Sequence, residues 1–348
     1  MLKICVQNPT FLLGDLQKNF NGYNFEFLRR YVKFIYITDL SKYFRYRQFC
    51  MNMGLKEIKF IFSVSNLNKY IDILICFNGL PHKIFHRPPK NYTGIKIFHT
   101  MDFIFHPKLA NKFLCDSAVN YLMTYNDHYK YSTFFKNYYP SFENKLISVP
   151  FGYGDRFTKK NDFNSRLNKA LALGSVNPIF DKNCNSNSVM DYVTFYPKIE
   201  FTHIVRREIV LRRHQLRNLV DDFLPTFPIT KNPDYNAVEL LNKYTMFIND
   251  EGIMNFPPAR TYEGIACGCV MVANRNQIYL ELGFIDGVNC ILFEPNNIED
   301  MCSKINYYIQ NPEILYDIHL QSIELAKKFN HKSIAEQLHN TILDKVKM

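Results

Sequence analysis

The sequence predicts an α/β protein of two domains, each built around a parallel sheet and facing the other across a cleft. Its 348 residues suffice for two ordinary domains that each bury a core of their own. Short apolar runs rich in β-branched residues alternate with amphipathic helical patterns, which is typical of strand–helix–strand crossovers. The polar stretch Gly152–Arg166 interrupts this alternation once. We therefore expect the two domains to join there.

Residues 1–155 are predicted to form an N-terminal Rossmann-like domain. Its apolar runs are nearly continuous, as expected for strands of a parallel sheet that is covered on both faces. Strands are expected at Leu2–Gln7, Phe34–Thr38, Ile71–Phe77, Gly94–His99, Tyr121–Tyr125 and Leu146–Pro150, and helices at Gly22–Tyr31 and Pro107–Ala118.

Residues 166–330 are predicted to form a second Rossmann-like domain. Its strands are expected at Lys169–Leu173, Thr245–Asn249, Val270–Ala273 and Cys290–Phe293. Helices are expected at Ile204–Val220, Ala237–Lys243, Ala259–Cys267, Ile298–Gln310 and Pro312–Phe329, and a loop in the Asn- and Ser-rich region Asp181–Ser188. The last segment, 331–348, carries a helix that we expect to pack back toward the N-terminal domain.

Composition and charge limit the classes of function. Lys and Arg outnumber Asp and Glu by 42 to 32, and this basic excess suits an anionic partner such as a phosphorylated small molecule or a membrane surface. No recognisable nucleic-acid-binding module is present, so we do not expect a nucleic-acid partner. The nine cysteines form no paired framework, which favours a reducing compartment.

Neither a signal peptide nor a membrane-spanning helix is expected, because no apolar run reaches about 18 residues. We predict a cytoplasmic protein. The segment Ser41–Phe49 interleaves basic and aromatic residues, so it suits either a peripheral contact with an anionic membrane or an ordinary helix with one buried face.

The stretch Asn255–Asn274 is the most informative part of the chain. Pro257 and Pro258 suit the first turn of a helix and Gly268 suits its left-handed end, before a buried strand. Helical spacing places Arg260 and Glu263 on one face of an otherwise small and apolar helix. Spacing alone leaves two interpretations open: an ion pair within the helix, or a pair of ligand-binding side chains.

This stretch, together with the later segment Gly287–Met301, resembles the C-terminal half of GT-B glycosyltransferases of the retaining group 1 class. The similarity is greatest to the branch of the spore-coat CgeB/YkvP proteins, and it extends over Lys169–Thr341. In that class the Glu of the matching helix accepts hydrogen bonds from the ribose hydroxyls of a nucleotide sugar. The resemblance thus implies that Glu263 binds the donor ribose, in a site that also includes Arg260, Tyr262 and Gly264.

The resemblance also implies that residues 1–155 form the acceptor domain and residues 166–330 the nucleotide-sugar donor domain, and it indicates where the rest of the donor is bound. Gly174 and Ser175 follow a strand and match a small-residue loop that faces the diphosphate. Arg206 and Arg207 match an arginine-bearing helix and are expected to bind phosphate; the alternative is a solvated basic face. Asn255 stands where the class often has a second Glu for the donor sugar, so Asn255 can hydrogen-bond the sugar but supplies no charge.

In the first half, His99 and Asp102 follow a predicted strand toward its carboxyl end. They are candidates for activating an acceptor hydroxyl or contacting the transferred sugar. The alternative is a core histidine and a helix-capping aspartate. No Asp-x-Asp motif is convincing, and the class uses protein cations at the leaving phosphate, so neither a metal ion nor another cofactor is expected.

We therefore predict a glycosyltransferase that moves a sugar from a nucleotide-diphosphate donor to a hydroxyl of a glycan, glycolipid or protein-linked acceptor. Two alternatives remain open. A sugar-nucleotide 2-epimerase shares the architecture but needs more acid and base groups. A degenerate, nucleotide-sugar-binding partner subunit would be compatible with Asn255.

Overall fold

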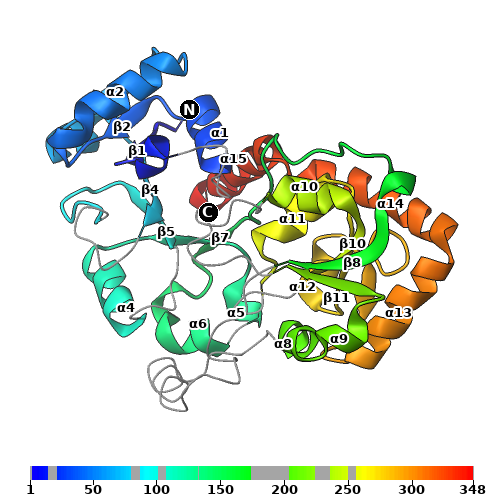
Figure 1. Ribbon diagram of the computed structural model, residues 1–348. Helices are drawn as coiled ribbons and strands as arrows, with labels where there is room; N and C mark the ends of the chain where they lie inside the picture. The colour runs from blue at the N-terminus through cyan, green and yellow to red at the C-terminus, as the bar shows by residue number, and fades with distance from the viewer. Residues whose placement is uncertain are drawn as a thin grey trace. The chain divides into compact units, whose positions relative to one another are not determined.

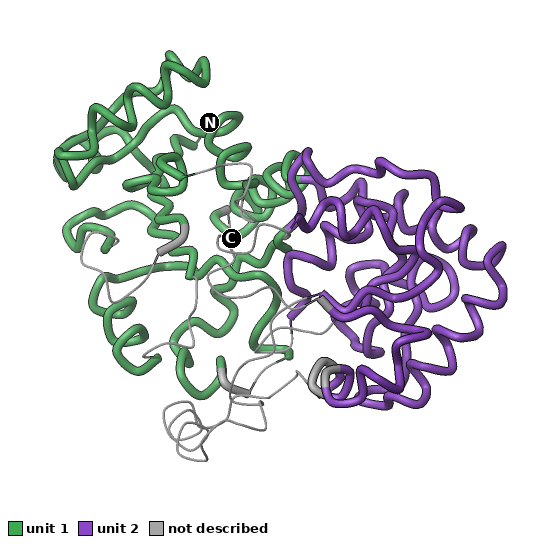
Figure 2. Tube along the Cα trace, viewed as in Figure 1, with its two compact units in different colours: residues 1–151, 331–348 green, residues 152–330 purple. Residues whose placement is uncertain are grey.

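Two parallel sheets form the framework of this protein in the computed structural model, which describes residues 2–14, 22–79, 87–100, 107–131, 133–173, 204–223, 236–249 and 256–347 (Figure 1). The chain divides into two compact units (Figure 2). Unit 1 comprises residues 1–151 and 331–348, and unit 2 comprises residues 152–330. Each unit contains one of the sheets.

Unit 1 holds a seven-stranded sheet in the order β3-β2-β1-β4-β5-β6-β7, with every neighbouring pair parallel. Its strands are β1 (Ile4–Gln7), β2 (Phe34–Tyr36), β3 (Lys59–Ile61), β4 (Ile73–Gly79), β5 (Ile95–Thr100), β6 (Tyr121–Thr124) and β7 (Leu146–Ser148). Its helices are α1 (Tyr23–Tyr31), α2 (Tyr43–Asn52), α3 (Val64–Tyr70), α4 (Pro107–Asp116), α5 (His128–Tyr131), α6 (Thr133–Tyr138) and α15 (His331–Lys347).

The final helix, α15, is part of unit 1 although the chain reaches it through unit 2. It packs against α1, where the rings of Tyr31 and His339 stack at 4.0 Å. The Tyr121 hydroxyl donates to the Lys345 carbonyl at 3.0 Å. The last turns of the chain are thereby fixed to β6.

Unit 2 holds a five-stranded parallel sheet in the order β12-β11-β10-β8-β9. Its strands are β8 (Leu167–Leu173), β9 (Val220–Phe223), β10 (Tyr244–Asn249), β11 (Val270–Asn274) and β12 (Ile291–Phe293). Its helices are α8 (Ile204–Leu211), α9 (Arg213–Leu216), α10 (Ala237–Lys243), α11 (Ala259–Ala266), α12 (Gln277–Glu281), α13 (Ile298–Gln310) and α14 (Pro312–Ala326). Strand order reverses between β8 and β10, and ligands of such open sheets bind outside the carboxyl ends of the strands at this switch point.

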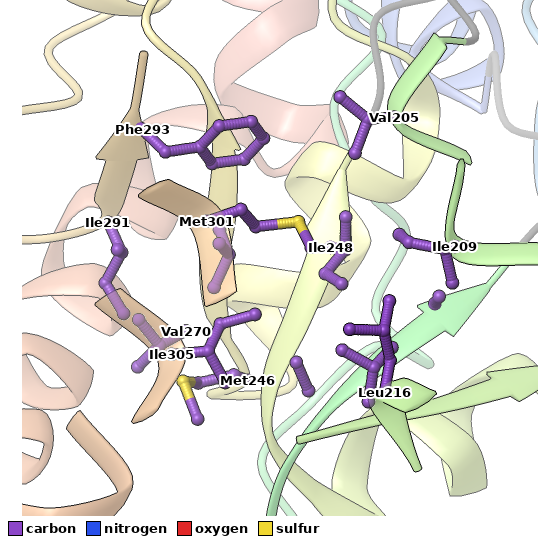
Figure 3. Packing of buried hydrophobic residues seen from close by; sticks show 14 of the residues in the cluster. Val205, Ile209, Leu216, Met246, Ile248, Val270, Ile291, Phe293, Met301 and Ile305 are labelled. Carbon is purple, nitrogen blue, oxygen red and sulfur yellow. The ribbon is translucent and has the colours of Figure 1, made fainter. Parts of the chain in front are cut away.

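The core of unit 2 is a continuous apolar cluster on one face of its sheet (Figure 3). Met246 and Ile248 of the central strand β10 are almost fully buried. Around them pack Val205 and Ile209 of α8 and Met301 of α13. The central strand therefore has little freedom to move.

The two parallel sheets confirm the predicted α/β class, and most of the expected strands are present within a few residues. The predicted helix Ile204–Val220 is interrupted at Arg212 and extends too far, because α9 ends at Leu216 and β9 begins at Val220. The edge strand β3 was not predicted. The expected loop Asp181–Ser188 lies outside the described residues.

Candidate functional site

The β10–α11 connection of unit 2 is the best candidate site, because β10 lies beside the switch point of its sheet. Helix α11 begins with Pro258 as its N-cap, so the two prolines precede the first turn that they were predicted to occupy. At its other end Gly268 has a φ of 73°, and the Cys269 amide donates to the Gly264 carbonyl at 3.0 Å. This confirms the predicted left-handed stop at Gly268.

The buried side of α11 fixes its position in the unit. Tyr262 is 1% exposed, and its ring lies 4.9 Å from that of Phe329. A Cβ on Gly264 would approach two ring atoms of Phe247, on β10, to 2.4 Å. Only glycine lets the helix lie this close to the central strand.

Asn249, the last residue of β10, joins the strand to two helices. Its fully buried amide donates to the Thr261 hydroxyl at 2.9 Å and to the Tyr279 hydroxyl at 2.7 Å. Its Oδ1 accepts from Arg260 Nε at 3.2 Å. The carboxyl end of β10 thus orients the guanidinium of Arg260 at the start of α11.

Glu263 has the chemistry expected of a ligand-binding carboxyl group. Burial raises its pKa to about 7, and the positive charges of Arg156 and Arg260 act in the opposite direction. The free carboxyl group is therefore close to half-ionised at neutral pH. A carboxyl so strongly perturbed, at the switch point of an α/β sheet, is a functional-site candidate.

Arg166 fixes the other end of α11. Arg166 is 7% exposed, and its guanidinium donates to the Cys267 carbonyl, at the C-cap of α11, at 2.8 Å. It also donates to the Leu241 carbonyl and to Asn242 Oδ1 at the end of α10, both at 3.3 Å. The carbonyl ends of two helices therefore converge on one buried cation, which matches the negative end of each helix dipole.

Several predicted donor residues lie outside what the structure describes. Gly174, Ser175 and Asn255 fall in the gaps of the described ranges. Arg206 and Arg207 belong to α8, but nothing is described of their side chains. The structure therefore brings together Arg260, Tyr262, Glu263 and Gly264, and of these Tyr262 and Gly264 face the interior.

His99 is the penultimate residue of β5 in unit 1 and is fully buried. Its ring lies 5.4 Å from that of Tyr125 and 6.2 Å from that of Phe77, and burial lowers its pKa to about 3. This is the environment of a neutral core histidine, the alternative that the sequence left open. Asp102 lies outside the described residues, and a catalytic role for either residue stays a prediction.

Sequence reasoning missed Arg156, Asn249 and Arg166. Asn249 carried the weak signal of a polar residue at the end of an apolar strand. Arg156 and Arg166 lie in the polar stretch that was interpreted only as a junction between domains. Nothing local to that stretch indicates that the Arg166 guanidinium meets a carbonyl 101 residues away.

Within the described residues, no three His, Cys, Asp or Glu side chains are grouped to hold a metal ion. No helix there has both the length and the apolar character required to cross a bilayer.

Several solved structures that are similar to this chain in fold are glycosyltransferases. A Rickettsia africae glycosyltransferase is 11% identical, with a TM-score of 0.56 over 99% of each chain. Anabaena HepE in complex with UDP and glucose is 13% identical, with a TM-score of 0.53 over 99% of this chain and 100% of that one. Thermosynechococcus elongatus sucrose-phosphate synthase is 10% identical, with a TM-score of 0.54 over the full length of both chains. The fold is therefore the GT-B fold.

Residues 230–340, which include α11, match the family described as glycosyl transferase-like. No curated protein matches the chain in sequence. The matching segment is thus a glycosyl transferase-like domain within a chain that has the GT-B fold, as the sequence resemblance predicted. The narrower CgeB/YkvP branch stays a prediction.

Proposed function

We propose that this protein is a glycosyltransferase that takes its sugar from a nucleotide diphosphate, and that Glu263 binds the ribose of the donor. The observation that carries the proposal is Glu263, a half-buried residue of α11 whose carboxyl group has its pKa raised to about 7 and two arginines near it. A carboxylate accepts hydrogen bonds from two vicinal hydroxyls in charge-assisted geometry. HepE, which has a similar fold, was crystallised with UDP and with UDP-glucose.

Protein cations, without a metal ion or another cofactor, are proposed to offset the charge of the departing diphosphate. Arg260 is oriented by Asn249, and Arg156 is near enough to act on the Glu263 carboxyl group. Arg206 and Arg207 on α8 are the further candidates, with Gly174, Ser175 and Asn255 around the diphosphate and the sugar. Stabilisation of developing charge by fixed cations is a major source of catalysis in such transfers.

The acceptor is proposed to be a hydroxyl of a glycan or a lipid-linked sugar, and the transfer to retain the anomeric configuration. His99 and Asp102 are the candidates to contact it or the transferred sugar. Because its imidazole is neutral, His99 could donate a hydrogen bond through one ring nitrogen and accept one through the other. NMR analysis of the anomer formed in the product tests the stereochemistry.

A peripheral contact with an anionic membrane is proposed for α2 in unit 1. Phe44 is 73% exposed there, beside the exposed Arg45 and Arg47, and Met51, two turns after Phe44, is 58% exposed. An apolar side chain flanked by cations suits the boundary of an anionic bilayer. Co-sedimentation with phosphatidylserine vesicles tests this contact, and Phe44→Ser is expected to reduce it. Equal co-sedimentation of Phe44→Ser and wild type would contradict the proposal.

Calorimetric titration with UDP tests the donor site directly. The wild-type protein is expected to bind UDP, and Glu263→Ala to weaken binding by at least tenfold, because both ribose hydroxyls lose their acceptor. Glu299→Ala is the matched control, since Glu299 is an exposed carboxylate in the same unit, paired with Arg212. Equal UDP affinity in Glu263→Ala and wild type would show that the site is misplaced. Products formed from UDP-glucose, with and without an added acceptor, separate transfer from epimerisation.

A further inference from the structure

Three buried polar groups at one end of unit 1 have no hydrogen-bond partner in the described part of the chain. They are the Asn126 side-chain amide, both of whose polar atoms are unpaired, the Thr100 hydroxyl and the Tyr23 hydroxyl. Asn126 is 8% exposed, and Thr100 and Tyr23 are fully buried. Such groups are rare in native proteins, because burial removes the water that would otherwise pair with them.

The sheet topology brings Thr100 and Asn126 to the same edge. Strands β5 and β6 are parallel neighbours, with His99 opposite Met123. Thr100 is the last residue of β5, and Asn126 follows β6 by two residues. Both therefore lie at the carboxyl edge of the sheet, where ligands of parallel α/β sheets bind.

The backbone of Asn126 is held in place while its side chain is left available. Its carbonyl accepts from the Thr124 hydroxyl and from the Ser148 hydroxyl, both at 2.8 Å. These two hydroxyls come from the ends of the neighbouring strands β6 and β7. A rigid residue with an unpaired amide is what a preorganised polar contact requires.

Aromatic rings border the same edge. The ring of Tyr23 lies 6.3 Å from that of His99, and the ring of Tyr125 lies 5.4 Å from His99 and 3.7 Å from Phe151. Ligand sites combine such apolar walls with a few fixed polar groups. A sugar has both complements, since its C–H face packs on rings while its hydroxyls donate to and accept from an amide.

We propose that Asn126, together with Thr100 and Tyr23, binds hydroxyl groups of a carbohydrate acceptor at the carboxyl edge of the unit 1 sheet. The kind of ligand rests on the proposed function, whereas the location rests on the unpaired groups. Asn126 donates through its Nδ2 and accepts through its Oδ1, so it suits two adjacent hydroxyls.

Saturation-transfer NMR with glucose, galactose, mannose, N-acetylglucosamine and glycerol, each in the presence of UDP, tests the binding. At least one of these is expected to bind the wild-type protein and to bind Asn126→Leu at least tenfold more weakly. Glu263→Gln should keep this carbohydrate binding, and Asn126→Leu should keep UDP binding. The two proposals therefore fail separately. Equal carbohydrate affinity in wild type and Asn126→Leu would overturn the inference.

The melting temperature provides a second test that does not depend on the choice of sugar. An amide kept for a ligand has no partner to lose in the free protein, so Asn126→Leu should melt at or above the wild-type temperature. Asn242→Leu is the comparison, because that buried amide donates to the Thr158 and Val238 carbonyls and should lower the melting temperature. A similar fall in the melting temperature of Asn126→Leu would show that the amide stabilises the fold and would overturn the proposal. This result counts even if no sugar of the panel binds.

Discussion

Replacing Gly264 with alanine is the sharpest test of how the core positions the candidate site. The new Cβ would lie 2.4 Å from Cε1 and Cζ of Phe247, so α11 or the ring must move by about 1 Å to reach ordinary carbon–carbon contact. Phe247 is fully buried on the central strand, which leaves the helix as the part that moves. Overpacking of this kind costs about 1–3 kcal/mol.

Two terms set the expected size of the effect. Alanine favours a helix over glycine by about 1 kcal/mol, which offsets part of the overpacking and leaves a loss of up to about 2 kcal/mol in the free energy of unfolding. Glu263 is the preceding residue on the same helix. Displacement of a positioned group by about 1 Å lowers the rate of a reaction by up to roughly 100-fold. We therefore expect Gly264→Ala to weaken UDP binding by at least tenfold.

Urea unfolding and calorimetric titration with UDP measure the two quantities, and Gly287→Ala is the control in the same unit. There the Cβ would meet Tyr308 Oη at an ordinary 3.8 Å, but φ is 72°, so only backbone strain of about 1–2 kcal/mol is expected, with UDP binding unchanged. Adding Phe247→Leu to Gly264→Ala should restore part of both losses. Wild-type stability and UDP affinity in Gly264→Ala would refute the reasoning.

Two further predictions concern Glu263 and Arg166. Because the pKa of Glu263 is raised from 4.5 to about 7, its carboxyl group must release a proton to bind the ribose below pH 7. The affinity for UDP-glucose should therefore fall by up to about tenfold for each pH unit below 7. The affinity of Glu263→Gln should not depend on pH in this way. Between pH 4.5 and 7 this carboxyl group is protonated in the folded state but ionised in the unfolded state. Its contribution to the free energy of unfolding therefore decreases as the pH rises from 4.5 to 7. Arg166→Met should lower the free energy of unfolding by about 3 kcal/mol in urea, because the Cys267 and Leu241 carbonyls lose their buried donor, and an unchanged midpoint would contradict that role.

The strands that sequence patterns predicted are those buried on both faces. Val270–Ala273 is a continuous apolar run, and all of β11 is buried. Strand β9 reads Val-Asp-Asp-Phe and lies at a sheet edge, where charged residues are tolerated. Its two carboxylates pair with Lys169 at 3.2 Å and Arg213 at 3.0 Å, so the strand lacks the apolar signal and was not predicted.

The part of the site that sequence predicted is local to one helix. Arg260 and Glu263 are three residues apart, so their shared face follows from helical periodicity. Asn249, Arg156 and Arg166 reach α11 only through tertiary packing. Local spacing therefore identified the carboxyl group but gave no information on what surrounds it, and that environment determines its pKa.

The position and the proton affinity of Glu263 both follow from the packing of α11. Phe247 and Tyr262 hold the helix against the core, and Arg166 holds its carbonyl end through Cys267. Burial on this scaffold disfavours the ionised carboxyl group in the free protein, because no hydroxyl donors replace the lost water. A ribose would supply such donors, so binding and ionisation are expected to be coupled. Changes to the buried side of α11 should for this reason alter donor affinity and its pH dependence together, even where they touch no ligand.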